Sequence, residues 1–177
     1  MVKSMATRKP LPVSIILATL AVSTLSAADS ALVVSGVTGK DGVEMPALSL
    51  TLDDLAKMPH VKATVKDDKT TRNFEGVPVY EILKRAGQPF GTLMRNAQLV
   101  RYAIFRAHDG YRALFALPEF DPSFTAARVI VADRLDGKSL PNNRGPLWLV
   151  VPDDKVSARS VYMLERIEIQ SAAEAMR

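Results

Sequence analysis

Polar side chains that could carry chemistry gather around two Asp-Gly dipeptides, Asp109-Gly110 and Asp136-Gly137. A histidine beside such a turn can bind a ligand or move a proton near neutral pH. The alternative is a structural histidine, in which His108 finds one hydrogen bond beside Tyr111. The residues that could contribute to a site here are His108, Asp109, Tyr111, Arg112, Asp133, Arg134, Arg144 and, further along, Arg159.

Several classes of site are excluded by residue type alone. The 177 residues contain no cysteine, which removes disulfides, a thiolate nucleophile and a cysteine-ligated metal centre from this sequence. The two histidines, His60 and His108, are too few for a multi-histidine zinc site. A glycine-rich phosphate loop and a nucleophile elbow are also missing from the sequence. The residue types and their spacing therefore match no known set of catalytic residues.

A hairpin over residues 99–117 must position the first group of candidates. Asp109-Gly110 suits the positive φ angles of a two-residue turn, which pairs His108 with Tyr111 and Ile104 with Phe115. Both faces of this hairpin are apolar at mid-strand. We therefore expect strands buried on both sides, with the turn end reaching solvent or a cleft.

The remaining elements predict one α+β domain. A composition of 47% hydrophobic and 24% charged residues is ordinary for a folded chain. Helices are few and short, and Trp148 is expected in the core. Core strands are predicted at 129–132 and 147–151, a terminal strand at 166–169, and helices after the Thr51 capping box, at 78–86 and at 118–121. We expect mixed, largely antiparallel sheets.

The first 28 residues predict a secretory signal peptide. Lys3, Arg8 and Lys9 precede an uncharged stretch with a short apolar core, and Ser26-Ala27-Ala28 ends it. A retained single membrane anchor is the alternative. Removal of residues 1–28 lowers the net charge from +4 to +1, because the segment holds three basic residues and no acidic one. We therefore expect the mature domain, 29–177, to be periplasmic or secreted, without a stable membrane span. A net charge of +1 gives no reason to expect nucleic-acid binding.

A family resemblance emerges from the order of several segments. Phe74-Glu-Gly-Val-Pro-Val precedes a short helix, and Asp109-Gly-Tyr lies in the hairpin. Later segments are Val129-Ile-Val-Ala-Asp, Asp136-Gly-Lys-Ser-Leu-Pro, Gly145-Pro-Leu-Trp-Leu-Val-Val-Pro and Ala158-Arg-Ser-Val. Over residues 50–169 the sequence resembles the molybdopterin-binding domain of the sulfite-oxidase-type oxidoreductases, especially their small exported stand-alone relatives.

The resemblance implies an α+β fold that cradles a molybdopterin cofactor in a cleft. In the family the segment matching 158–162 supplies basic residues to the pterin phosphate. Arg159 matches one of them, whereas Tyr162 stands where a lysine is common. Together with the residues at the hairpin turn, this gives five expected cofactor-binding residues: Arg159, Arg144, His108, Tyr111 and Ser160. For each arginine the alternative is a solvated surface charge.

Because the sequence contains no cysteine, cofactor binding and catalysis have to be considered separately. In the full-length relatives a cysteine thiolate ligates molybdenum, and this sequence offers only methionine sulfur. We therefore expect a domain that binds a molybdopterin-type cofactor or a related anionic ligand without independent oxo-transfer. Two alternatives stay open. One is a non-catalytic periplasmic ligand- or protein-binding module, and the other is an electron-transfer or maturation partner of a membrane redox system.

The charge layout of the N-terminus generates a direct test. We expect the mature protein to begin at or near Asp29 and to be recovered in the periplasmic fraction. Mass spectrometry of the purified protein measures the N-terminus. A soluble cytoplasmic protein that retains Met1 would contradict the export prediction.

Overall fold

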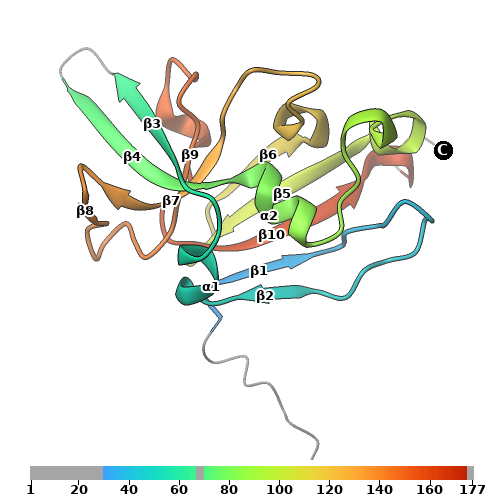
Figure 1. The fold of residues 1–177 in the computed structure, drawn as a ribbon, viewed down its shortest axis with the longest axis horizontal. Helices are drawn as coiled ribbons and strands as arrows, with labels where there is room; N and C mark the ends of the chain where they lie inside the picture. The colour runs from blue at the N-terminus through green and yellow to red at the C-terminus, as the bar shows by residue number, and fades with distance from the viewer. Residues whose placement is uncertain (1–29, 67–69, 175–177) are drawn as a thin grey trace, which may run out of the picture.

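The structure is a computed structural model that describes residues 30–66 and 70–174; the expected signal peptide, 1–28, lies outside the described residues. Two five-stranded sheets form the fold (Figure 1). The first has the order β2-β1-β10-β5-β6, in which β1 and β10 are parallel and the other pairs are antiparallel. Its strands are β1 (Leu32–Ser35), β2 (Leu48–Leu50), β5 (Arg101–Ala107), β6 (Arg112–Ala116) and β10 (Leu164–Ser171).

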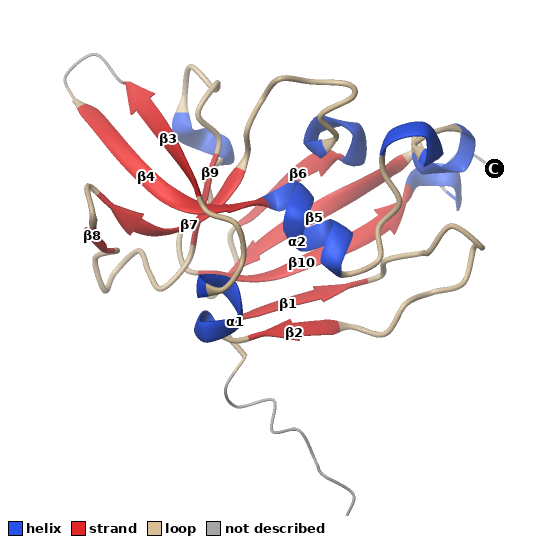
Figure 2. Ribbon diagram, in the orientation of Figure 1, coloured by secondary structure: helices blue, strands red, loops and turns tan. Residues whose placement is uncertain are grey.

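The second sheet is antiparallel throughout its described strands. Its order is β3-β4-β7-β8, and β9 also pairs with β7. The strands are β3 (Val61–Lys66), β4 (Thr71–Pro78), β7 (Ile130–Leu135), β8 (Lys138–Ser139) and β9 (Trp148–Val150). The helical elements are short (Figure 2). They are α1 (Leu52–Ala56), α2 (Val79–Arg85), η2 (Gly91–Leu93), η3 (Asn96–Gln98), η4 (Leu117–Phe120), η5 (Ser157–Arg159) and η6 (Ala172–Glu174).

The predicted α+β class, with mixed and largely antiparallel sheets, is confirmed. Local signals located several elements correctly. Thr51 caps α1 with its side chain, and Asp54 caps it reciprocally, as the capping box predicts. Pro78 is the N-cap of α2, and Gly87 follows its end with a φ of 93°. No helix in the described part of the chain is long and apolar enough to cross a membrane.

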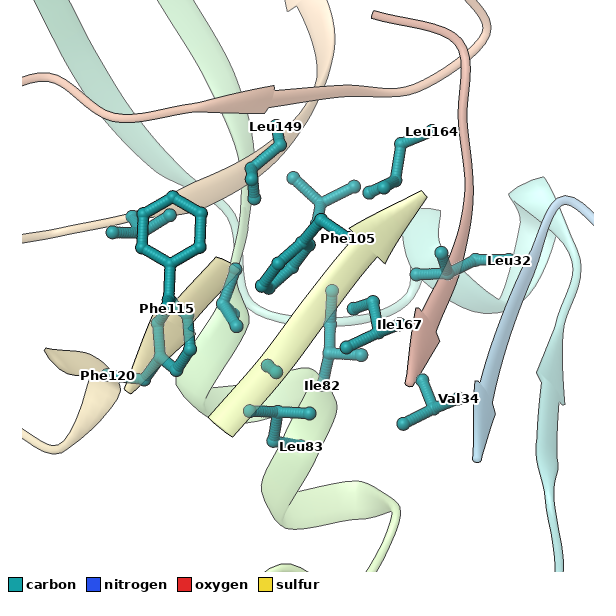
Figure 3. Close-up of a cluster of buried hydrophobic side chains, with 14 of the residues drawn as sticks. Leu32, Val34, Ile82, Leu83, Phe105, Phe115, Phe120, Leu149, Leu164 and Ile167 are labelled. Carbon is teal, nitrogen blue, oxygen red and sulfur yellow. The ribbon is translucent and has the colours of Figure 1, made fainter. Parts of the chain in front are cut away.

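The two predicted core strands, β7 and β9, are buried on both faces. In β7, Val131 belongs to the main core, whereas Ile130 belongs to a second, smaller cluster. In β9, Leu149 faces the main core and Trp148 the second cluster. The main core lies between the first sheet, α2 and these strands, and Figure 3 shows part of it. Uninterrupted apolar runs are the sequence pattern that such two-sided burial produces.

The 99–117 hairpin forms, but its predicted register is wrong by one residue. Ala103 pairs with Phe115 and Phe105 with Ala113. The loop has three residues rather than two: the Ala107 N–H donates to the Tyr111 carbonyl at 2.9 Å, and Gly110 has a φ of 88°. An Asp-Gly dipeptide suits both loop lengths, so the signature does not distinguish them.

The shift also corrects the predicted burial. A slip of one residue exchanges the two faces of a strand. Phe105 and Phe115 are fully buried on one face, whereas Leu114 on the other is 56% exposed. The expectation of two-sided burial is therefore wrong for this hairpin. At Asp136-Gly137 the two-residue turn is confirmed, because Leu135 pairs with Lys138 and both turn residues have positive φ angles.

The Gly110 conformation gives a stability prediction. A β-carbon at Gly110 would meet nothing within 4 Å, so the cost of substitution comes from the backbone alone. We expect Gly110→Val to lower the free energy of unfolding by about 1–2 kcal/mol, and Gly110→Asn by clearly less, because asparagine tolerates positive φ. Urea denaturation measures both. Equal stability of the valine variant and the wild type would refute the three-residue loop.

Candidate functional site

A cleft of about 400 Å³ lies between the tip of the β5–β6 hairpin and the segment 156–162. Its walls include Tyr111, Val156, Ser157, Ser160 and Tyr162. We call it the hairpin cleft. Two of the five predicted cofactor-binding residues, Tyr111 and Ser160, line it. The side chains of its wall combine aromatic surface with hydroxyl groups, a combination suited to a small polar ligand with a ring.

Arg159 belongs to η5, the short helix whose segment forms one wall of this cleft. Its guanidinium makes two hydrogen bonds to Asp154, from Nε to Oδ2 at 2.9 Å and from Nη2 to Oδ1 at 2.7 Å. Nη1 donates to Oε2 of Glu119 at 2.9 Å. The guanidinium carbon also lies 4.6 Å from the centre of the Phe115 ring. Three hydrogen bonds and one ring contact therefore fix the segment that carries Ser157 and Ser160.

This arrangement makes Arg159 a strongly held cation. Hydrogen bonds to Asp154, and then to Glu119, raise the pKa of the guanidinium above its ordinary value, and partial burial opposes this weakly. Two carboxylates thus already occupy donors that a phosphate would need. A direct contact between Arg159 and a pterin phosphate, as the resemblance implies, requires exchange of a carboxylate for the phosphate. That role stays a prediction.

The Glu119 carboxylate, which accepts a hydrogen bond from Arg159, is held in place at the start of η4. Its other oxygen, Oε1, accepts a hydrogen bond from the Ala116 N–H at 2.8 Å. Asp121, just past η4, accepts hydrogen bonds from the Gly91 and Ser123 N–H groups at 2.6 and 2.9 Å. Burial of Asp121 disfavours its charged form, but these bonds outweigh burial and hold its pKa below the usual value. The Glu119 carboxylate therefore caps the start of η4, and the Asp121 carboxylate fixes the residue that follows its end.

Tyr111 ties the hairpin tip to the same segment. Its hydroxyl donates to the Ala158 carbonyl oxygen, and its N–H donates to the Asp109 carboxylate at 2.9 Å. The side chain is 47% exposed. Tyr111 therefore bridges the two walls of the hairpin cleft while part of its ring stays accessible.

Arg144 contacts the ring of Tyr162, a residue that lines the cleft. Its guanidinium carbon lies 4.9 Å from the centre of the Tyr162 ring and 5.4 Å from that of Trp148. The structure gives its side chain no carboxylate partner among the described residues. Aromatic faces attract a guanidinium without consuming its N–H donors. The contacts of Arg144 with the two rings therefore leave its guanidinium N–H donors unused.

His108 lies away from this group. Its Nδ1 is 2.5 Å from Oε1 of Glu165 in β10, and its side chain is 72% exposed. With Glu165 and Met163 it lines a separate cleft of about 450 Å³. The structure therefore brings Tyr111 and Ser160 together in the hairpin cleft, whereas Arg144, Arg159 and His108 do not line it. The ring of His108 is hydrogen-bonded to Glu165.

Sequence reasoning missed three contributors, Ser157, Asp154 and Glu119. Ser157 carried a weak signal, since it precedes the family-like segment by one residue. Glu119 lies 40 residues from Arg159, and only the fold places the two side chains together. Among the described residues, no three His, Cys, Asp or Glu side chains are arranged to hold a metal ion.

Comparison with known proteins identifies the fold and the family. The fold is the sulfite-oxidase-like molybdopterin-binding fold. Residues 65–176 match the oxidoreductase molybdopterin binding domain family, and the chain belongs to that family. No curated protein matches the sequence significantly.

A solved structure with the same fold is the sulfane dehydrogenase SoxCD from Paracoccus pantotrophus, with a TM-score of 0.58 and 17% sequence identity. The match covers 78% of this chain and 37% of the SoxCD chain. At this identity the likeness shows the fold alone. The chain thus spans little more than a third of that relative's length.

The Arg159 contacts give a second stability prediction. Arg159→Met keeps an apolar stem over Phe115 but removes the three hydrogen bonds. We expect the free energy of unfolding to fall by about 1–2 kcal/mol. This is less than three buried charge-assisted hydrogen bonds would contribute, because the side chain is 41% exposed and solvent screens its charge. Arg112→Met, at an exposed arginine of β6, is the control and should change stability by less than about 0.5 kcal/mol. Equal effects in urea denaturation would show that the three contacts do not stabilise the fold.

Proposed function

We propose that this chain is an exported domain that binds a molybdopterin-type cofactor, or a related anionic ligand, in the hairpin cleft. Membership of the family supports the class of ligand. The cleft volume of about 400 Å³ falls within the range of roughly 300–1,000 Å³ typical of small-molecule sites. Export rests on the basic, apolar and small-residue pattern of residues 1–28.

The observation that carries the proposal is the position of Arg144. Its guanidinium lies on the Tyr162 ring, which lines the cleft, and keeps its donors available. A ligand ring between Tyr111 and Tyr162 would place an attached phosphate within reach of this edge. The Ser157 and Ser160 hydroxyls supply further hydrogen bonds. Arg159 acts in this arrangement by fixing the segment that carries both serines.

The residues around the hairpin cleft are suited to hold the pterin and phosphate of the cofactor. They do not supply the ligand by which the family attaches the metal. When bound, the complete cofactor supplies a redox-active molybdenum centre. The relatives ligate this metal with a thiolate, and the 177 residues contain no cysteine. We therefore assign the chain ligand binding and derive no oxo-transfer step from its residues. Tyr111, Ser157, Ser160, Tyr162 and Arg144 are the groups that would hold the ligand.

A second candidate is a non-catalytic module that binds another ligand or a protein, including a partner in a membrane redox system. The occupied donors of Arg159 favour it, because the family's phosphate-binding position is engaged within the chain itself. A titration with pterins distinguishes the two candidates. Failure of a pterin to bind would support the second.

The proposal predicts a specific loss in the Arg144→Gln variant. We expect it to weaken binding of a phosphorylated pterin about tenfold, since a charge-assisted contact is lost, and to leave binding of the same pterin without phosphate nearly unchanged. Calorimetric titration measures both affinities. Arg134→Gln, at an exposed arginine of β7 that lines a different cleft, is the matched control.

Two results would count against this assignment. Equal affinity of Arg144→Gln and Arg134→Gln for the phosphorylated pterin would remove Arg144 from the site. Absence of binding to the wild type would remove the pterin altogether.

A further inference from the structure

The two faces of the first sheet have different surroundings. One face packs against α2, β7 and β9 and contributes residues such as Phe105 and Ile167 to the main core (Figure 1). The alternate residues of the same strands point the other way, and they are exposed or half-buried. We call this surface the outer sheet face. Its centre consists of Ile104, Arg106, Arg112, Leu114, Arg166 and Glu168.

Three arginines form one row across the outer sheet face. Arg106 in β5 pairs with Arg166 in β10 on one side and with Arg112 in β6 on the other. Residues that pair directly across neighbouring strands have adjacent side chains, and like charges in this arrangement destabilise a sheet. The row therefore has a cost for the isolated fold, and an acidic partner would remove that cost.

The carboxylates near this row do not neutralise all of it. Glu168 accepts a hydrogen bond from Nη2 of Arg106 at 2.9 Å, so it compensates the central arginine. Glu165 is hydrogen-bonded to a histidine ring. Arg112 and Arg166 are exposed, and within the described part of the chain neither guanidinium has a hydrogen bond or an ion pair. The two ends of the row are therefore uncompensated cations.

An apolar pair lies beside the arginine row. Two residues further along the strands, Ile104 pairs with Leu114, and Leu114 is 56% exposed. A sheet face that meets only water usually carries polar side chains at such positions. Apolar side chains next to arginines are instead typical of the surface that a protein presents to a partner.

The type of cation supports the same interpretation. The strands of the first sheet contain arginine and no lysine. In the second sheet, by contrast, the short strand β8 and the edge strand β3 carry lysines. Lysine is common on sheet edges that stay in solvent, whereas protein interfaces are enriched in arginine and depleted in lysine.

We propose that the outer sheet face docks an acidic surface of another protein. Carboxylates of this partner would pair with Arg112 and Arg166, and an apolar side chain would cover Ile104 and Leu114. A layer of anionic lipid fits less well, because its uniform charge would also face Glu168. A protein can place its carboxylates opposite the arginines alone. The interface does not involve the hairpin cleft, so it stands whether or not a pterin binds there.

A short peptide of glutamates with a central leucine is a defined probe for this face. Titration of the peptide into the ¹⁵N-labelled protein maps its contacts by NMR. We expect saturable shifts at the amides of β5, β6 and β10, and we expect added salt to weaken them, because the contacts are exposed. A peptide with lysine in place of glutamate should cause no such shifts.

Variants of the face test which side chains hold the peptide. We expect Arg112→Gln and Arg166→Gln each to weaken binding about two- to fivefold, because both side chains are exposed and solvent screens them. Leu114→Ser should also weaken it, which an interaction by charge alone would not explain. Arg134→Gln, at an exposed arginine of the second sheet, is the matched control and should bind like the wild type.

A stability measurement separates loss of binding from loss of the fold. Replacement of Arg112 or Arg166 relieves a contact between like charges, so the free energy of unfolding should not fall in either variant. Urea denaturation measures it. Weaker binding by a variant of unchanged stability supports the proposal.

Four outcomes would overturn the proposal. The first is the absence of saturable shifts, and the second is an equal loss of affinity in Arg134→Gln and the two variants of the face. The third is tighter binding to phosphatidylglycerol vesicles than to the peptide, which would assign the face to a membrane. The fourth is a dimer in sedimentation that Leu114→Ser abolishes, which would assign it to a second copy of the chain. A failure of the pterin titration leaves all of these results unaffected.

Discussion

The three hydrogen bonds of Arg159 are the constraint on which the candidate site depends. They join one short segment, η5, to a loop carboxylate five residues earlier and to Glu119 in η4. The Phe115 ring beneath the guanidinium connects this cluster to the main core. Ser157 and Ser160, which flank Arg159, line the hairpin cleft. One arginine therefore holds the segment that forms one wall of the cleft.

Much of the fold follows from local patterns in the sequence. The apolar runs of β7 and β9, the Thr51 capping box and the proline before α2 each act over a few residues, and all are found where expected. The register of the β5–β6 hairpin could not be read in this way, because Asp-Gly serves two- and three-residue loops alike. The pairing of β1 with β10 joins the two ends of the domain and has no local signature.

The site was less predictable than the fold, since its geometry comes from distant partners. Residue type and family order singled out Arg159 as a phosphate ligand, but its carboxylate partner Glu119 lies 40 residues away. His108 likewise meets Glu165 across 57 residues, which takes it to a different cleft from Tyr111. Arg144 is linked to the hairpin cleft only through its contact with the Tyr162 ring, and that ring packs edge to face against Trp148. Such contacts can be predicted only once the sheet topology is known.

The central claim is that Arg159 shapes a ligand cleft that Arg144 completes. A crystal structure of the protein, purified from the organism that produces it with its ligand retained, tests this most directly. We expect electron density for a ring between Tyr111 and Tyr162 and for an anionic group at Arg144, with Arg159 still bound to Asp154 and Glu119. A phosphate bound to Arg159 itself, with those carboxylates displaced, would contradict it.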